Sequence, residues 1–235
     1  SSVVALFNNS FDDSEDEVPG GSSADNLAGV AVKSNSTTGD QGDWQYSTDG
    51  GAIWAPLGTD MTPSEALVLS STALVRFDPT PNWNGVPGSL VVHLIDDYDG
   101  DVTTGIIEDL TEGVGDPTVY SVNTVTLETQ VIAVNDAPVV TNNSITLSPI
   151  DEDDTDPPGS DVSSLFGGSF DDSEDEVPGG SSADNLAGVA VRSNSATADQ
   201  GVWQYKDGGP WTDLPVVSET EALVLSSTAL VRFDP

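Results

Sequence analysis

The chain has 235 residues, of which 40 are acidic and 5 are basic, so that its formal net charge is −35. This charge argues against a nucleic-acid partner and against binding to anionic membranes, because both require basic patches. The chain has no cysteine, and no apolar run reaches the roughly 18 residues of a membrane span, so disulfides, thiol chemistry and membrane insertion are not expected. The charge suits a protein that binds cations or works in salty water.

The sequence predicts an all-β fold built from short strands. Gly, Pro, Asn and Asp separate segments rich in Val, Ile, Leu and Thr at spacings typical of a β-sandwich. The predicted strands cover residues 27–33, 44–46, 53–54, 66–69, 73–77, 89–95, 121–134 and 145–147. One helical turn is predicted at residues 2–7 and another at residues 162–166.

A long internal repeat organises the chain. Residues 10–33 and 169–192 agree at 23 of 24 positions, and the one change replaces Lys33 by Arg192. A period of about 155 residues indicates a string of domains, because solenoid repeats are typically about 20–50 residues long. We therefore expect one β-sandwich repeat at 1–138, without its opening strand, and the N-terminal part of a second repeat at 139–235.

The second repeat has no counterpart of residues 80–138 in this sequence. Alone it would expose unpaired strand edges and half a core, which folded proteins avoid. We expect either that the polypeptide continues at both ends or that strands from another copy complete the repeat.

Acidic residues gather where the predicted strands end. Five carboxylates lie within residues 12–17 and five more within 171–176, and further acidic groups follow at 96–101, 135–136 and 151–154. Calcium takes six to eight oxygen ligands from carboxylates, amides and carbonyls, and the loops of a sandwich gather at its two ends. The segment with Asp97, Asp99 and Asp101 has the alternation of a calcium loop, although no EF-hand Glu follows it. Calcium is therefore the expected cofactor; the alternative is that these are solubilising loops of a salt-adapted protein.

The remaining chemical features favour structural roles. Ser47-x-Asp49-x-Gly51-x-x-Trp54 predicts a hairpin whose aspartate ties down the turn. Trp44, Tyr46 and Trp54 would suit a sugar-stacking platform, but aromatic residues in strands usually belong to the core. His93 is the only histidine, so neither a zinc site nor a catalytic triad is expected, and we predict that the protein is not an enzyme.

Several motifs together resemble the tandem cadherin-like repeats of giant bacterial surface adhesins and biofilm proteins. The resemblance runs through the motifs AVNDAP (133–138), EDDT (152–155), GDWQYSTDGG (42–51) and VRFDP (75–79), and covers nearly the whole chain. It implies tandem Ig/cadherin-like β-sandwich repeats, with Ca²⁺ stiffening the repeats and their joints.

The resemblance also implies particular metal ligands. They are Glu152 and Asp153, the pair Asp13 and Glu15 with its copy Asp172 and Glu174, and the linker residues Asn135 and Asp136. The family pattern has Asp where this chain has Glu15 and Glu174. The implied function is a structural extender module of a calcium-dependent adhesin at the extracellular surface of a bacterium, with neighbouring repeats as partners. The alternative is a carbohydrate-binding adhesin module that contacts surface glycans through the aromatic hairpin.

Overall fold

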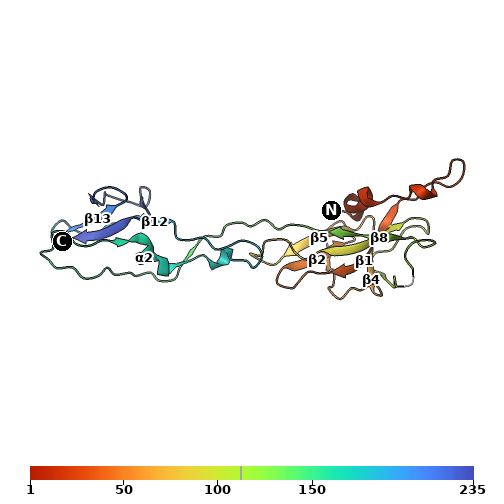
Figure 1. The fold of residues 1–235 in the computed structure, drawn as a ribbon, viewed down its shortest axis with the longest axis horizontal. Coiled ribbons are helices and arrows are strands. Elements are labelled where there is room, and N and C mark those ends of the chain that lie inside the picture. The colour runs from red at the N-terminus through yellow and green to blue at the C-terminus, as the bar shows by residue number, and fades with distance from the viewer. Residues whose placement is uncertain (112) are drawn as a thin grey trace. The chain divides into compact units, whose positions relative to one another are not determined.

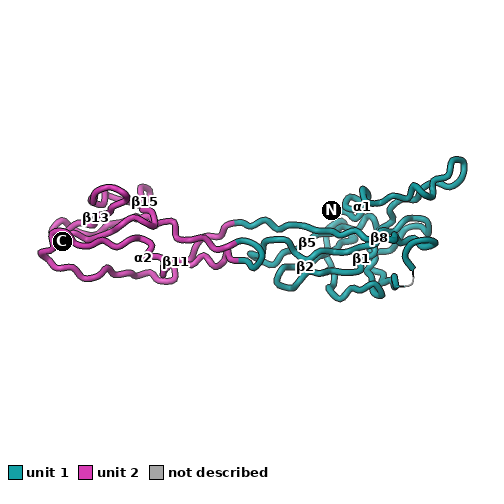
Figure 2. The backbone as a smooth tube through the Cα atoms, viewed as in Figure 1, with its two compact units in different colours: residues 1–134, 177–181 teal, residues 135–176, 182–235 magenta. Residues whose placement is uncertain are grey.

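The structure, a computed structural model, describes residues 1–111 and 113–235, and most of its ordered elements are antiparallel strands (Figure 1). Within these residues the α-helices are α1 (Val3–Phe7) and α2 (Val162–Phe166), which confirms the predicted helical turns and the all-β class. No helix in the described part of the chain has the length and apolar character needed to cross a membrane. The chain divides into two compact units, coloured separately in Figure 2: unit 1 is residues 1–134 with 177–181, and unit 2 is residues 135–176 with 182–235.

Unit 1 contains two antiparallel sheets. After α1 come the 3₁₀ turns η1 (Asn8–Ser10) and η2 (Ser14–Asp16), followed by β1 (Leu27–Asn35), β2 (Gly42–Ser47), β3 (Ala55–Pro56), β4 (Ala66–Ser70), β5 (Leu74–Pro79), β6 (Leu90–Asp96), β7 (Ile107–Glu108) and β8 (Tyr120–Leu127). The larger sheet has the order β7-β4-β1-β6-β8 and the smaller one the order β3-β2-β5.

The core of unit 1 lies between these sheets, as in a sandwich. Val32 of β1 and Val92 of β6 are buried in the same cluster as Trp44 of β2 and Val75 of β5. The Trp44 ring meets Phe77 edge to face at 5.5 Å, a geometry that aromatic pairs prefer. Unit 1 is thus a sandwich-like all-β body.

Unit 2 repeats part of this arrangement. Its elements are β9 (Val139–Val140), β10 (Ser160–Asp161), α2, η3 (Gly167–Ser169), β11 (Phe170–Asp171), η4 (Ser173–Asp175), β12 (Gly188–Val191), β13 (Val202–Lys206), β14 (Thr212–Asp213), β15 (Leu223–Ser226) and β16 (Leu230–Asp234). They form sheets of order β10-β16-β13-β14, β11-β9 and β12-β15. β12 pairs with β15 in the register in which β1 pairs with β4, as Val189↔Leu225 matches Val30↔Leu69.

The predicted hairpin turn after β2 is confirmed. Asp49 Oδ1 accepts hydrogen bonds from the backbone N–H groups of Ala52 and Ile53, both at 2.9 Å, and from Ser47 Oγ at 2.8 Å. The turn occupies the chain as far as Trp54, which is why β3 begins at Ala55 and not at the predicted residue 53.

Two strand predictions were wrong in extent or in kind. The strand predicted at 121–134 ends at Leu127, because Leu127 pairs with Leu90, the first residue of β6. Within residues 128–134 pairing continues as an isolated bridge between Val131 and Gly85. Residues 145–147 form no strand; Ile145 and Leu147 instead line a cavity in unit 2.

Matched valines in the two copies show how completely the core of each unit is buried. Val32 is 0% exposed, whereas its counterpart Val191 is half-buried. We expect Val32→Ala to destabilise unit 1 by about 2 kcal/mol, from lost methyl burial and the cavity left behind, and Val191→Ala to cost unit 2 less than about 1 kcal/mol. Native-state hydrogen exchange in β1 and β12 measures each unit separately, as two units need not unfold together. Equal losses would contradict the difference in burial.

Candidate metal centre

Three aspartates of unit 1 come together at one end of β1. One carboxylate oxygen each from Asp13, Asp16 and Asp25 lies within 4.8 Å of the other two. Asp13 caps the 3₁₀ turn η2 and Asp16 ends it, and residues three apart in a 3₁₀ turn lie on the same side. Asp25 stands two residues before β1. The 3₁₀ turn η2 and the residues just before β1 therefore bring the three aspartates together.

Backbone hydrogen bonds hold this arrangement. Asp16 N donates to Asp13 O at 3.2 Å, which closes the turn. Asp25 N donates to Asp13 Oδ2 at 2.7 Å, which joins the acidic loop to the start of β1. The Asp12 carboxylate accepts from Ser14 N at 3.0 Å and so supports the loop from outside the cluster.

The pairing of β1 with β6 adds further acidic residues to the same end. Leu27 of β1 pairs with Asp96 of β6, and Asp97 follows directly. The Asp97 carboxylate accepts from Asn26 N at 2.7 Å and from Asn26 Nδ2 at 3.1 Å. Two chain segments about 70 residues apart therefore contribute carboxylates to one surface.

The electrostatics of this surface favour a cation. Partial burial and, after it, the charges of neighbouring carboxylates raise the pKa of Asp25 above its ordinary value of 3.8. Those neighbours are, in order of effect, Asp13, Asp97 and Asp16. Burial raises the pKa of Asp96, and the nearby carboxylate charges add to this rise against the opposing effect of a hydrogen bond from Tyr98 N. The hydrogen bonds from Asn26 lower the pKa of Asp97. In the described residues the ion pairs are made by Arg76, Arg192 and Arg232, and none of these pairs includes an aspartate of the cluster.

The donor set fits a divalent cation that prefers oxygen. Calcium–oxygen distances are about 2.3–2.6 Å, so two ligands on opposite sides of the ion are at most about 5 Å apart. The oxygen separations of up to 4.8 Å in the cluster fall within that limit. Asp13, Asp16 and Asp25 could therefore hold a metal ion together, with the remaining ligands left to backbone carbonyls or water.

The other predicted ligands lie in different environments. Asp97 borders the cluster through Asn26, whereas Glu15, Asp99 and Asp101 are exposed and outside it. In unit 2, Glu152, Asp153 and Glu174 are exposed. Asp172 repeats the Asp13 contact by accepting from Asp184 N at 2.6 Å.

The predicted linker residues have a hydrogen-bond partner in the acidic loop of unit 2. Asp136 N donates to both carboxylate oxygens of Asp175, at 3.0 and 3.2 Å, and Asn135 Nδ2 donates to Asp136 O at 2.6 Å. Asp175 corresponds to Asp16 in the repeat. The linker and the acidic loop thus meet at Asp175.

Sequence reasoning missed Asp25 and left Asp16 unassigned. Both residues belong to the segment that agrees at 23 of 24 positions between the copies. Asp25 also lies two residues before a strand, much as the predicted acidic groups follow one. The sign in the sequence that Asp25 belongs to an acidic site is therefore its position close to the end of a predicted strand.

Comparison with protein-family models, with curated proteins and with solved structures found no match to this chain.

The raised pKa of Asp25 gives a testable expectation for the metal-free protein. Because the fold disfavours ionised Asp25, its charge costs stability above the folded pKa, and this cost disappears as the pH falls through that pKa toward 3.8. We expect Asp25→Asn to raise the Tm at pH 7 in resin-treated, metal-free buffer, with a gain that shrinks as the pH is lowered.

Asp43→Asn is the matched control, since it removes the same charge from an exposed position of β2 outside the cluster. A loss of stability in Asp25→Asn at pH 7, or a gain no larger than that of Asp43→Asn, would show that Asp25 is not under electrostatic strain.

Proposed function

We propose that the chain is a structural module of a calcium-dependent extracellular bacterial adhesin, in which cation binding stiffens sandwich-like repeats. The observation that carries the proposal is the cluster of Asp13, Asp16 and Asp25 at the end of a sandwich-like unit. Its support from the sequence is the near-identical second copy of the acidic loop.

The three aspartates are the residues that would hold the ion, and Asp97 is close enough to the group to affect the pKa of Asp25. Hard oxygen ligands select Ca²⁺ or Mg²⁺ over softer metals, and flexible loop carboxylates suit Ca²⁺, which accepts irregular coordination. Because Asp13 also binds the start of β1, a cation there would tie the acidic loop to the sheet. This is how cation binding would stiffen the end of the unit.

The second copy supports the same role for the linker. Asp136 lies at the start of unit 2, and its N–H group binds Asp175 of the acidic loop. The loop that carries the cluster in one copy therefore holds a linker residue in the other. These two contacts support a structural role for the acidic loop in both copies.

No observation favours the carbohydrate alternative. Trp44 is buried, and the Arg76 guanidinium lies 4.2 Å from the centroid of the Trp54 ring. The Trp54 Nε1–H group donates to Gly51 O at 3.0 Å, so this side chain supports its own turn. The aromatic residues of the hairpin thus have structural partners in unit 1.

The test is thermal unfolding with a chelator and with about 5 mM Ca²⁺ at constant ionic strength. With a Kd of about 10⁻⁴–10⁻³ M, as in extracellular modules, binding stabilises the folded state by about 1–2 kcal/mol and raises the Tm of unit 1 by several degrees. We expect the double variant Asp13→Asn/Asp25→Asn to abolish this rise and Asp43→Asn to retain it.

Mg²⁺ at the same concentration separates specific binding from general screening of the acidic surface. An equal rise with Mg²⁺, or a Tm that does not respond to Ca²⁺, would contradict the proposal and leave salt adaptation as the interpretation of the acidic loops.

A further inference from the structure

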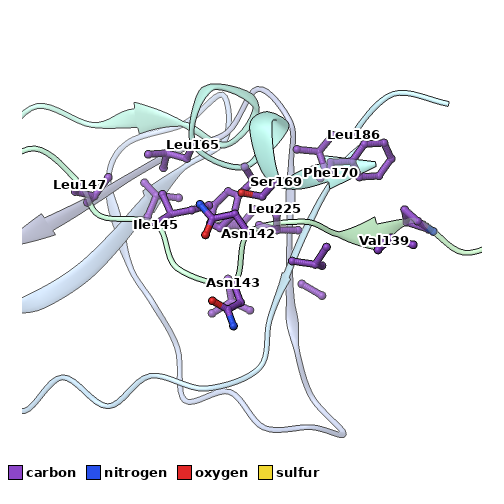
Figure 3. Close-up of a pocket in the computed structure, with 18 of the residues that line it drawn as sticks. Val139, Asn142, Asn143, Ile145, Leu147, Leu165, Ser169, Phe170, Leu186 and Leu225 are labelled. Atoms are coloured by element: carbon purple, nitrogen blue, oxygen red, sulfur yellow. The ribbon is translucent and has the colours of Figure 1, made fainter. Parts of the chain in front are cut away.

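Unit 2 contains an apolar cavity beside the edge of a strand. The cavity has a volume of about 600 Å³, and Val189 and Val191 of β12 line it together with Trp203, Leu225 and Phe170. Figure 3 shows Leu165, Phe170, Leu186 and Leu225 grouped around this space. In the described residues β12 has one ladder partner, β15.

Unit 1 shows what lies at the corresponding place. β1, which contains the GVAV sequence of β12, pairs with β4 on one side and with β6 on the other. On the β6 side Val30 faces Leu94 and Val32 faces Val92. Leu94 and Val92 fill the core cluster that also contains Val30 and Val32.

The exposed fractions of matched side chains show how unit 2 differs from unit 1 at this place. Val32 and Ala31 are 0% exposed in β1, but Val191 is half-buried and Ala190 is exposed in β12. In the neighbouring strand Val68 is 3% exposed, whereas its counterpart Val224 is 73% exposed. The paired residues are chemically identical, so the difference comes from what covers them.

We propose that the free edge of β12 and the adjoining cavity bind an extended polypeptide strand with the chemistry of β6. The strand adds antiparallel to β12, with a residue like Leu94 opposite Val189 and one like Val92 opposite Val191. This register follows from Val30↔Leu94 and Val32↔Val92 in unit 1. The proposal does not depend on the calcium proposal.

The chemistry of the site selects a strand over other apolar ligands. Backbone N–H and C=O groups on the open side of β12 need hydrogen-bond partners, and only another backbone supplies them in register. Residues 88–95 of the β6 region contain no carboxylate, so such a strand approaches a chain of net charge −35 without adding repulsion in its apolar part. Backbone pairing and the alternating apolar side chains together define the ligand.

The test uses a labelled synthetic peptide with the sequence of residues 88–97, added to the full chain. Fluorescence anisotropy measures binding, and hydrogen exchange locates it. We expect exchange to slow in Gly188–Val191 on peptide addition. Exchange in Leu27–Asn35 of the same molecule is the internal control and stays unchanged, because β6 already occupies that edge.

Variant peptides test the register. Leu94→Asp places a charge opposite Val189 in the cavity and is expected to weaken binding at least about tenfold. Val91→Asp adds the same charge at a position that is only half-buried in β6 and is expected to weaken binding less. The protein variant Val189→Asp should also lose binding, and the peptide variants keep the test valid if that protein fails to fold.

Three outcomes would overturn the proposal. They are unchanged exchange in Gly188–Val191 at millimolar peptide, equal binding of the Leu94→Asp and Val91→Asp peptides, and a peptide-free dimer in sedimentation analysis with β12 already protected. The last outcome would assign the edge to a second copy of the chain.

Discussion

The pairing of β1 with two strands at once is the constraint on which unit 1 depends. β4 and β6 flank β1, so its apolar residues meet side chains from both neighbours and from the opposite sheet. The same pairing brings Asp96 of β6, and Asp97 after it, beside Asp25 and Asn26. Core packing and the acidic cluster are therefore two results of one strand contact, which explains why the acidic surface lies at the end of the sheet that contains β1.

Because of the internal repeat, nearly the same sequence occurs in two different structural surroundings. The pair β12 and β15 keeps the register of β1 and β4, and Trp203 meets Phe233 at 5.3 Å much as Trp44 meets Phe77. Local strand pairing and aromatic contacts thus form without β6. What unit 2 does not reproduce is the burial of the strand that β6 covers. The local alternation of apolar residues is enough to form the strand pairs, whereas closing the core requires a strand that is distant in sequence.

The sequence predicted the strands well and the cluster only in part, for a physical reason. Alternating Val, Ile and Leu predict β1 and β6 directly, because their side chains alternate across the sheet. The predicted pair Asp13 and Glu15 assumed an alternate-residue spacing, whereas the 3₁₀ turn η2 brings Asp16 beside Asp13. Asp25 joins through a backbone hydrogen bond across 12 residues, and no spacing rule within the loop reveals such a bond.

The two proposals, strand addition and cation binding, both involve β6. Its alternate apolar residues close the core over β1, and the acidic residues at its end reach the start of the same strand. Asp184 occupies in unit 2 the position of Asp25, and its N–H group already binds Asp172 as Asp25 N binds Asp13. A β6-like strand on the free edge of β12 would therefore close the apolar cavity and bring carboxylates toward Asp184. If cation binding is as we propose for unit 1, the charge that such a strand adds would favour a cation at Asp184, so that completing the core and completing the acidic site become one event.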